Sequence, residues 1–182
     1  MLELNFTPFP VLETERLLLR RVLPSDVEQV FMMRNDPVLT QYTWVTAQTT
    51  EDALGHINRV DGLINNNEAL MWGICLKGEE QLAGTICYWN IEKEIDKGEL
   101  GYGLVHGYMK RGIMNEALQT VLRYGFEVLH FKKIEAYTHR HNRGSINLLQ
   151  RNGFALHPDM EAKKAGVEEL RDRLIFLLEP RA

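Results

Sequence analysis

Short apolar runs alternate with polar turns along the whole chain, and their spacing separates strand signals from helix signals. Residues 16–22, RLLLRRV, form an apolar run typical of a strand. The pattern Ser25-x-x-Glu28 predicts a capping box that opens a helix over residues 25–33. A second helix is expected over residues 50–65, because apolar residues recur there on one face. These apolar positions are Ala53, Ile57, Val60 and Ile64.

Residues 70–105 carry three strand signals that are separated only by short polar connections. Such connections favour antiparallel hairpins. Residues 114–129 then predict an amphipathic helix, and KKIEAYT at 132–138 predicts a further strand. Residues 145–152 predict a short helix closed by Gly153, and the segments FALH and DRLIFLLE supply two more strands.

This order of elements indicates the α+β class, in an α/β three-layer arrangement. We expect a mixed, mainly antiparallel sheet of about seven strands, with about four helices on its faces. The chain has 182 residues, a length that suits one ordinary domain. We therefore expect a single domain over residues 1–182, with residues 1–11 as an N-terminal extension.

Composition and charge narrow the classes of function. The 21 Lys and Arg residues face 25 Asp and Glu residues, so the formal net charge is −4 and direct nucleic-acid binding by charge is not expected. Neither a membrane-spanning run nor a targeting segment is evident, which favours a cytoplasmic protein. Cys75 and Cys87 lie in strand-like runs and are expected to be reduced core thiols. His139 and His141 have no third ligand at metal-binding spacing, so no metal is expected.

A basic turn links an apolar strand to the long helix within residues 98–116, GELGYGLVHGYMKRGIMNE. It holds Lys110, Arg111 and Gly112. A glycine before a helix start leaves backbone N–H groups free at the positive end of the helix dipole, beside two cations here. The turn therefore suits a phosphate group, although a solvated basic turn explains the same residues.

Two other phosphate-binding loops are excluded. The spacing of Gly107 and Gly112 matches a P-loop, but Ile113 and Met114 follow where that loop requires Lys and Ser or Thr. The Gly-x-Gly pair just upstream lacks the third glycine of the dinucleotide fingerprint. Neither a P-loop NTPase nor a nicotinamide enzyme is supported.

Residues 138–154, THRHNRGSINLLQRNGF, place Asn142 just past a strand and Ser145 three residues later. Both suit simple capping of a short helix. Together with the Lys110-Arg111-Gly112 turn, however, the segment resembles the GCN5-related N-acetyltransferases (GNAT), in the branch of the ribosomal-protein alanine N-acetyltransferases RimJ and RimL. The resemblance covers nearly the whole chain, through LETERLLLRRVLPSDVEQVF, LAGTICYW and GELGYGL.

The resemblance implies acetyl-CoA as cosubstrate. In this family strands 4 and 5 splay apart, here the strand ending at Leu104 and Val105 and its neighbour near residue 135, and the pantetheine arm pairs with backbone in the split. The pyrophosphate would lie on the N–H groups of residues 110–115, and Arg140, Arg143 and Arg151 are available for the 3′-phosphate. The implied cofactor residues are Leu104, Val105, Lys110, Arg111, Gly112, Ile113, Met114, Asn115, Asn142 and Ser145.

The family's chemistry is direct attack of an amine on the thioester. The implied function is transfer of an acetyl group to a primary amine, either a small molecule or the N-terminus of a peptide or protein. Because the amine must lose a proton, a base is required. Glu99 is the first candidate, and a rim carboxylate without a role in proton transfer is its alternative; Glu161 is the second candidate. Ser145 is the remaining donor to the departing thiolate, since Leu149 occupies the position where many relatives carry a tyrosine.

A second function stays open on the sequence alone. Leu149, together with Met109 and Met114 in the turn, departs from the family pattern and is compatible with a catalytically silent acyl-CoA-binding regulatory module. Both functions predict CoA binding, so only turnover separates them. A monomer or a homodimer is expected. Trp44, in the loop between the first two helices, is a candidate for acceptor selection.

Overall fold

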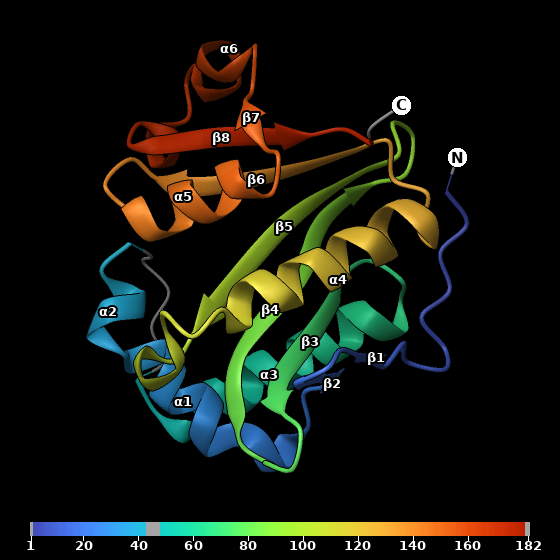
Figure 1. Ribbon diagram of the computed structural model, residues 1–182, viewed down its shortest axis with the longest axis vertical. Helices are drawn as coiled ribbons and strands as arrows, with labels where there is room; N and C mark the ends of the chain where they lie inside the picture. Colours follow the sequence, from blue (N-terminus) through green and yellow to red (C-terminus); the bar gives the residue numbers. More distant parts are fainter. Residues whose placement is uncertain (1, 43–47, 181–182) are drawn as a thin grey trace.

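A computed structural model describes residues 2–42 and 48–180, apart from the side chains of residues 161, 162 and 169, as one sheet with helices on both faces (Figure 1). The sheet has eight strands in the order β1-β2-β3-β4-β5-β6-β8-β7. Neighbouring strands are antiparallel, except that β5 and β6 run parallel. Trp44 lies outside the described residues.

The first part of the chain forms one end of the sheet and the helices beside it. Its elements are β1 (Leu12–Glu13), β2 (Leu17–Arg21), α1 (Val27–Asn35), α2 (Pro37–Thr40), α3 (Thr50–Asn65), β3 (Leu70–Leu76), β4 (Leu82–Glu92) and β5 (Lys97–Leu104). The second part adds α4 (Ile113–Glu127), β6 (Lys133–His139), α5 (Arg143–Arg151), β7 (Ala155–Leu156), α6 (Met160–Lys164) and β8 (Arg173–Leu178).

Figure 1 shows α4 and α5 in front of the sheet and α3 behind it. The front layer packs through the apolar face of α4, where the Tyr88 hydroxyl of β4 donates to the Val121 carbonyl at 2.9 Å. The rear layer packs through the four apolar residues of α3, all of which are buried, as predicted. Cys75 and Cys87 are free and buried, which confirms their expected place in the core.

The predicted α+β architecture is confirmed, with differences in detail. Within the described residues there are eight strands and six helices instead of about seven and about four. The additional elements are short: β1 has two residues, α2 has four and α6 has five. Such elements carry too few residues to show a period, so the sequence pattern did not reveal them.

The predicted capping box at Ser25 and Glu28 is wrong. Residues 24–26 form a 3₁₀ turn, and α1 begins only at Val27. The Leu23 N–H donates to the carboxylate of Asp26 at 2.7 Å, and the same carboxylate forms a buried ion pair with Arg20 at 2.8 Å. This ion pair fixes Asp26 as the residue that organises the turn, a contact that the local sequence pattern does not contain.

The sheet opens between β5 and β6, as the family resemblance implied. The two strands pair from Lys97 and Lys133 to Leu100 and Ala136, and beyond that point they diverge (Figure 1). Each strand keeps its other neighbour: β5 pairs with β4 as far as Leu104, and β6 pairs with β8 as far as His139. The far end of each strand therefore presents one unpaired edge toward the split.

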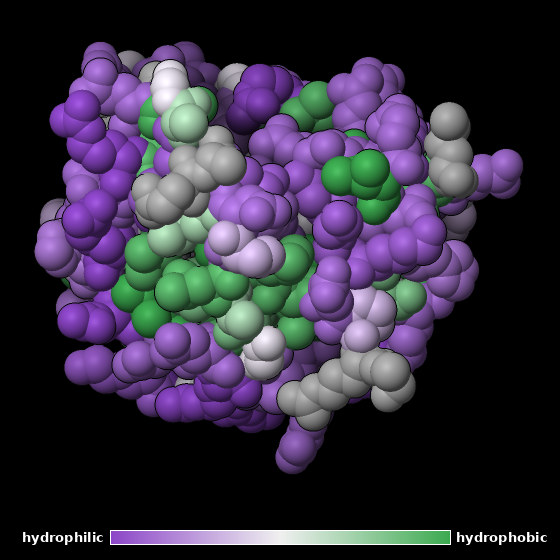
Figure 2. Space-filling view, turned by 90° about the horizontal axis from the view of Figure 1, so that it is seen from above, coloured by the Kyte–Doolittle hydropathy of each residue, from purple (hydrophilic) through white to green (hydrophobic). Residues whose placement is uncertain are grey.

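Viewed from above, Figure 2 shows a mostly hydrophilic face with one larger apolar patch and smaller apolar groups apart from it. In the described parts of the chain, no helix is long and apolar enough to cross a membrane.

Candidate active site

The turn before α4 leaves the start of the helix open. Gly112 has a φ of +77° at the N-cap position and no side chain caps the helix. The first backbone bond of the helix runs from the Glu116 N–H to the Gly112 carbonyl at 3.1 Å. The N–H groups of residues 113–115 therefore lie at an uncapped helix N-terminus, the arrangement that binds phosphate groups in many proteins. Lys110 and Arg111 are exposed beside it.

Glu116 and Arg16 hold this turn in place. The Arg16 guanidinium donates to the Glu116 carboxylate at 2.7 Å and to the Arg111 carbonyl at 3.1 Å. Thr14 and the Arg16 backbone N–H also donate to Glu116. Burial opposes ionisation of Glu116, but these bonds outweigh it and keep its pKa below the ordinary value. A groove of about 550 Å³ lies along this network and the start of α4.

Sequence reasoning missed Arg16 as a site residue, because its partners lie about 100 residues away. No local pattern could have found the contact.

Two of the three residues that open α4 turn their side chains into the core. Ile113 and Met114 are buried in the core, so the larger Met114 side chain does not cover the helix start. The Asn115 side chain accepts a hydrogen bond from Asn152 at 2.9 Å, which joins the start of α4 to the end of α5. A ligand at this turn would thus meet the N–H groups of residues 113–115 and not the side chains of Ile113 and Met114.

Tyr102 and Ser145 meet across the split. Their hydroxyl oxygens lie 2.8 Å apart and join the unpaired end of β5 to the first turn of α5. Burial raises the pKa of Tyr102 to about 12, although the hydrogen bond to Ser145 by itself lowers this pKa. Tyr102 was not predicted as a site residue. Its place in β5 follows from the sequence, but its contact with a residue 43 positions away does not.

The end of β5 directs successive backbone N–H groups to opposite sides. The Val105 N–H donates to the Ala83 carbonyl of β4 at 2.8 Å, so it does not face the split. Because amides alternate between the two sides of a strand, the Leu104 N–H points the other way, toward the split.

Asn142 caps α5, since its side-chain oxygen accepts from the Ser145 N–H at 3.1 Å. This is the capping role that the sequence left open, and it leaves the side-chain NH₂ of Asn142 for other partners. Leu149, on the same helix, is completely buried and belongs to the core.

Glu99 lies on the opposite face of the sheet from Tyr102, at the closed end of the split. It pairs in register with Trp89 of β4 and Glu135 of β6. Glu99 is partly exposed, and within the described part of the chain its carboxylate accepts one hydrogen bond, from Asn90 at 2.8 Å. Such a carboxylate keeps lone pairs for a further proton or donor.

Glu135 is the more deeply buried carboxylate, with 2% of its surface exposed. It contacts Lys163 at 3.0 Å, Lys97 at 3.2 Å and His157 at 3.3 Å, and it accepts from the Tyr137 hydroxyl. Burial opposes its ionisation, but Lys163 and Lys97 outweigh burial and lower its pKa. Sequence reasoning missed this cluster, which joins β5 and β6 to the segment that carries α6.

Comparison with known proteins identifies the family of this chain. Residues 16–155 match the family model described as "Acetyltransferase (GNAT) domain". The N-acetyltransferase YoaA of Bacillus subtilis is 31% identical over 147 residues, which cover 80% of this chain and 83% of YoaA. The chain belongs to the GNAT acetyltransferase family. It is an N-acetyltransferase by that membership.

Two further comparisons agree with this assignment. The N-acetyltransferase p20 of Bacillus licheniformis is 30% identical over 165 residues, 90% of each chain. The structure of RimL, a ribosomal L7/L12 alpha-N-protein acetyltransferase in complex with coenzyme A, has the same fold with a TM-score of 0.80. It is 21% identical, and the match covers 93% of this chain and 98% of RimL.

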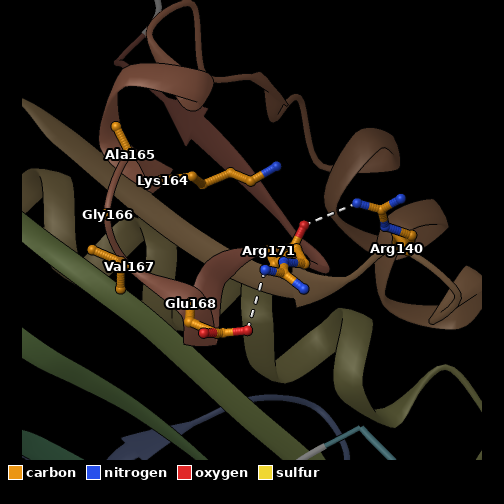
Figure 3. Close-up of a pocket in the computed structure, with 7 residues that line it drawn as sticks. All are labelled: Arg140, Lys164, Ala165, Gly166, Val167, Glu168 and Arg171. Atoms are coloured by element: carbon orange, nitrogen blue, oxygen red, sulfur yellow. Dashed lines mark hydrogen bonds and ion pairs between the residues drawn. The ribbon is translucent and has the colours of Figure 1, made fainter.

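The remaining predicted residues of this acetyltransferase lie around α5 and α6. Glu161 belongs to α6, but its side chain lies outside the described residues. Arg140 borders a pocket of about 600 Å³ together with Arg171 and residues 164–168 (Figure 3). It donates to the Arg171 carbonyl at 2.9 Å and pairs with Asp172 at 3.1 Å.

The contacts of Arg140 affect which arginine is available for the 3′-phosphate of CoA. Because Arg140 is committed to the 171–172 turn, it is a weaker candidate for a phosphate contact than Arg143 or Arg151. Both of those arginines are exposed. Among the described residues no group of three or more His, Cys, Asp or Glu could hold a metal ion.

Proposed function

We propose that this acetyltransferase transfers an acetyl group from acetyl-CoA to a primary amine, on a small molecule or on the N-terminus of a peptide or protein. One observation carries the proposal: the split between β5 and β6 adjoins the uncapped N-terminus of α4. An unpaired strand edge suits an extended amide-containing chain, and an uncapped helix start suits a pyrophosphate. The related RimL structure, which holds coenzyme A, supports the same pairing of fold and ligand.

The residues present fit acetyl-CoA. The Leu104 N–H and the Asn142 side chain would hold the pantetheine arm, and the N–H groups of residues 113–115 would hold the pyrophosphate. Lys110 and Arg111 add two positive charges at that point. When bound, acetyl-CoA supplies an activated thioester for attack by the amine.

Glu99 is the proposed base. It would take one proton from the ammonium form of the acceptor, so that the neutral amine attacks the thioester carbon. Glu135 cannot take this role at low cost, because protonating it would break its ion pairs with Lys97 and Lys163. Of these two neighbouring carboxylates, Glu99 is the one with free lone pairs on the exposed side.

Ser145 and Tyr102 are proposed to stabilise the departing thiolate by hydrogen bonding. A phenol is a stronger acid than an alcohol, so Tyr102 donates to Ser145 and leaves the serine O–H directed elsewhere, toward the sulfur. Full proton transfer from Tyr102 is unfavourable: its pKa of about 12 exceeds an ordinary thiol value near ~8.5, a difference worth about 5 kcal/mol. The thiolate therefore takes its proton from solvent, and the attacking nitrogen releases its second proton to solvent as the tetrahedral intermediate collapses to the amide.

Turnover of acetyl-CoA tests the proposed function. Release of free thiol from acetyl-CoA should be measured across peptide N-termini, polyamines and amino sugars. Thiol release that depends on one class of amine supports the proposal. Tight CoA binding without release on any amine would contradict it and support the silent acyl-CoA-binding module instead.

A further inference from the structure

Three basic side chains lie together between α1 and α3. Arg34 belongs to α1, and His56 and Arg59 belong to α3, which packs against α1. Arg59 Nη2 lies 3.2 Å from His56 Nδ1. Burial, and then the charges of Arg34 and Arg59, lower the pKa of His56 to about 4, so the imidazole is neutral at pH 7. Within the described residues no carboxylate pairs with either arginine.

Arg34 is the unusual member of this cluster. Its Nε atom is buried and has no hydrogen-bond partner. Leaving a buried donor unpaired costs about 1–3 kcal/mol, and more for a charged group. The other half-buried arginines of the N-terminal strands are paired: Arg20 with Asp26, and Arg21 with Asp61. A half-buried arginine with an unpaired Nε, beside the exposed guanidinium of Arg59 in a chain of net charge −4, is complementary to an anion from outside the described chain.

The cluster lies close to the proposed base. The Arg59 guanidinium carbon is 5.9 Å from the centre of the Trp89 ring, and Trp89 pairs with Glu99 across β4 and β5. Trp89 and Glu99 project from neighbouring strands on one face with a spacing of about 4.8 Å, so the guanidinium lies within about 11 Å of Glu99. An extended peptide rises about 3.3 Å per residue, so about three residues span this distance.

We propose that Arg34, His56 and Arg59 form an oxyanion subsite for a carboxylate or phosphate that the acceptor carries within about 11 Å of the amine to be acetylated. The position of the amine rests on the proposed function, because it is set by Glu99. Guanidinium groups match carboxylate and phosphate oxygens in pairs of hydrogen bonds. Since His56 Nδ1 faces the donors of Arg59, the proton of its neutral ring is on Nε2, which supplies a further donor.

The first experiment tests the subsite without acetyl transfer. Inorganic phosphate is titrated into the full chain, with sodium chloride at equal ionic strength as reference, and the ring resonances of His56 are followed by NMR. A saturable shift is expected, and it should be lost in Arg34→Gln and in Arg59→Gln. The control Lys77→Gln, which removes a charge from an exposed pair with Glu13, should keep the shift. Absence of a saturable shift, or its persistence in both arginine variants, overturns the proposal.

The second experiment asks whether the acceptor carries the anion. Two peptides with a free N-terminus are compared, one with Glu and one with Gln at the third and fourth positions. We expect kcat/KM at least tenfold higher for the Glu peptide in the wild type and in Lys77→Gln, with the ratio falling toward one in Arg59→Gln. Equal rates for both peptides overturn the acceptor-borne anion even if phosphate binds. Failure to acetylate any amine would overturn the proposed function, and the phosphate titration would still decide the subsite.

Discussion

Glu99 and Glu135 are register neighbours in the sheet, yet their surroundings give them different chemistry. Glu135 is buried and held by two lysines, whereas Glu99 is partly exposed and bonded to Asn90. Replacing Glu99 with Gln should lower the acetylation rate by about 10² to 10⁴ while acetyl-CoA affinity stays nearly constant, because proton transfer matters only on the way to the transition state. Steady-state kinetics and calorimetry on the same preparation measure both quantities.

Glu161→Gln is the parallel variant for this prediction. Full activity in Glu99→Gln together with loss of activity in Glu161→Gln would identify Glu161 of α6 as the base. Full activity in both variants would exclude a carboxylate base and leave positioning of the amine as the main contribution to rate.

Tyr102 and Ser145 act as a pair in this account, so their variants should not be additive. Ser145→Ala and Tyr102→Phe should each lower kcat, and the double variant should cost little more than Ser145→Ala alone. Both effects should shrink with acyl donors whose leaving thiol is more acidic, because such a thiolate needs less stabilisation. Tyr124→Phe on α4, which packs against Trp72, is the matched control and should show no dependence on the leaving group. Additive losses of kcat that do not depend on the acidity of the leaving thiol would contradict the pairing of Tyr102 with Ser145.

At the scale of elements, the turn before α4 owes its shape to a contact between distant segments. Arg16, just before β2, bonds both to Glu116 of α4 and to the carbonyl of Arg111. Arg111→Glu should weaken acetyl-CoA binding by reversing a charge, and Gly112→Trp should weaken it by adding a side chain at a φ of +77° beside the helix start. Calorimetry measures the affinity, and urea unfolding confirms that the fold persists. Unchanged affinity in both variants would show that the cofactor does not bind at this turn.

Elements with a clear period were predictable. The predicted range 50–65 is the observed α3, because four apolar residues recur there on one face. The split was expected only through the family resemblance, since no residue of β5 marks the point where pairing ends. Residues that act through distant partners escaped prediction: Arg16 bonds to Glu116, and Tyr102 meets Ser145. These contacts depend on strand register and helix placement, which a local pattern does not specify.

For the whole molecule, the buried cluster around Glu135 ties the sheet to the segment carrying α6. Because folding lowers the pKa of Glu135 below its ordinary 4.5, its contribution to stability is present above about pH 4.5 and is lost as the pH falls below it. Glu135→Gln should destabilise the protein at pH 7 by about 3–5 kcal/mol, since it leaves two lysines near a neutral amide. Glu13→Gln, which removes an exposed carboxylate paired with Lys77, should cost less than about 1 kcal/mol.

Urea unfolding between pH 3 and pH 7 measures both effects. The stability difference between wild type and Glu135→Gln should narrow as the pH falls. A difference that is constant over this range would contradict the assigned role of the Glu135 charge.

Acetyl-CoA is proposed to occupy the split between β5 and β6 and the open start of α4. The most direct test is an NMR titration of the full chain with acetyl-CoA, in which the backbone amide resonances are followed. We expect the largest chemical-shift changes at the amides of Leu104 and of residues 113–115, and small changes along β2 and β3. Shifts confined to other parts of the chain, or none at saturating acetyl-CoA, would contradict it.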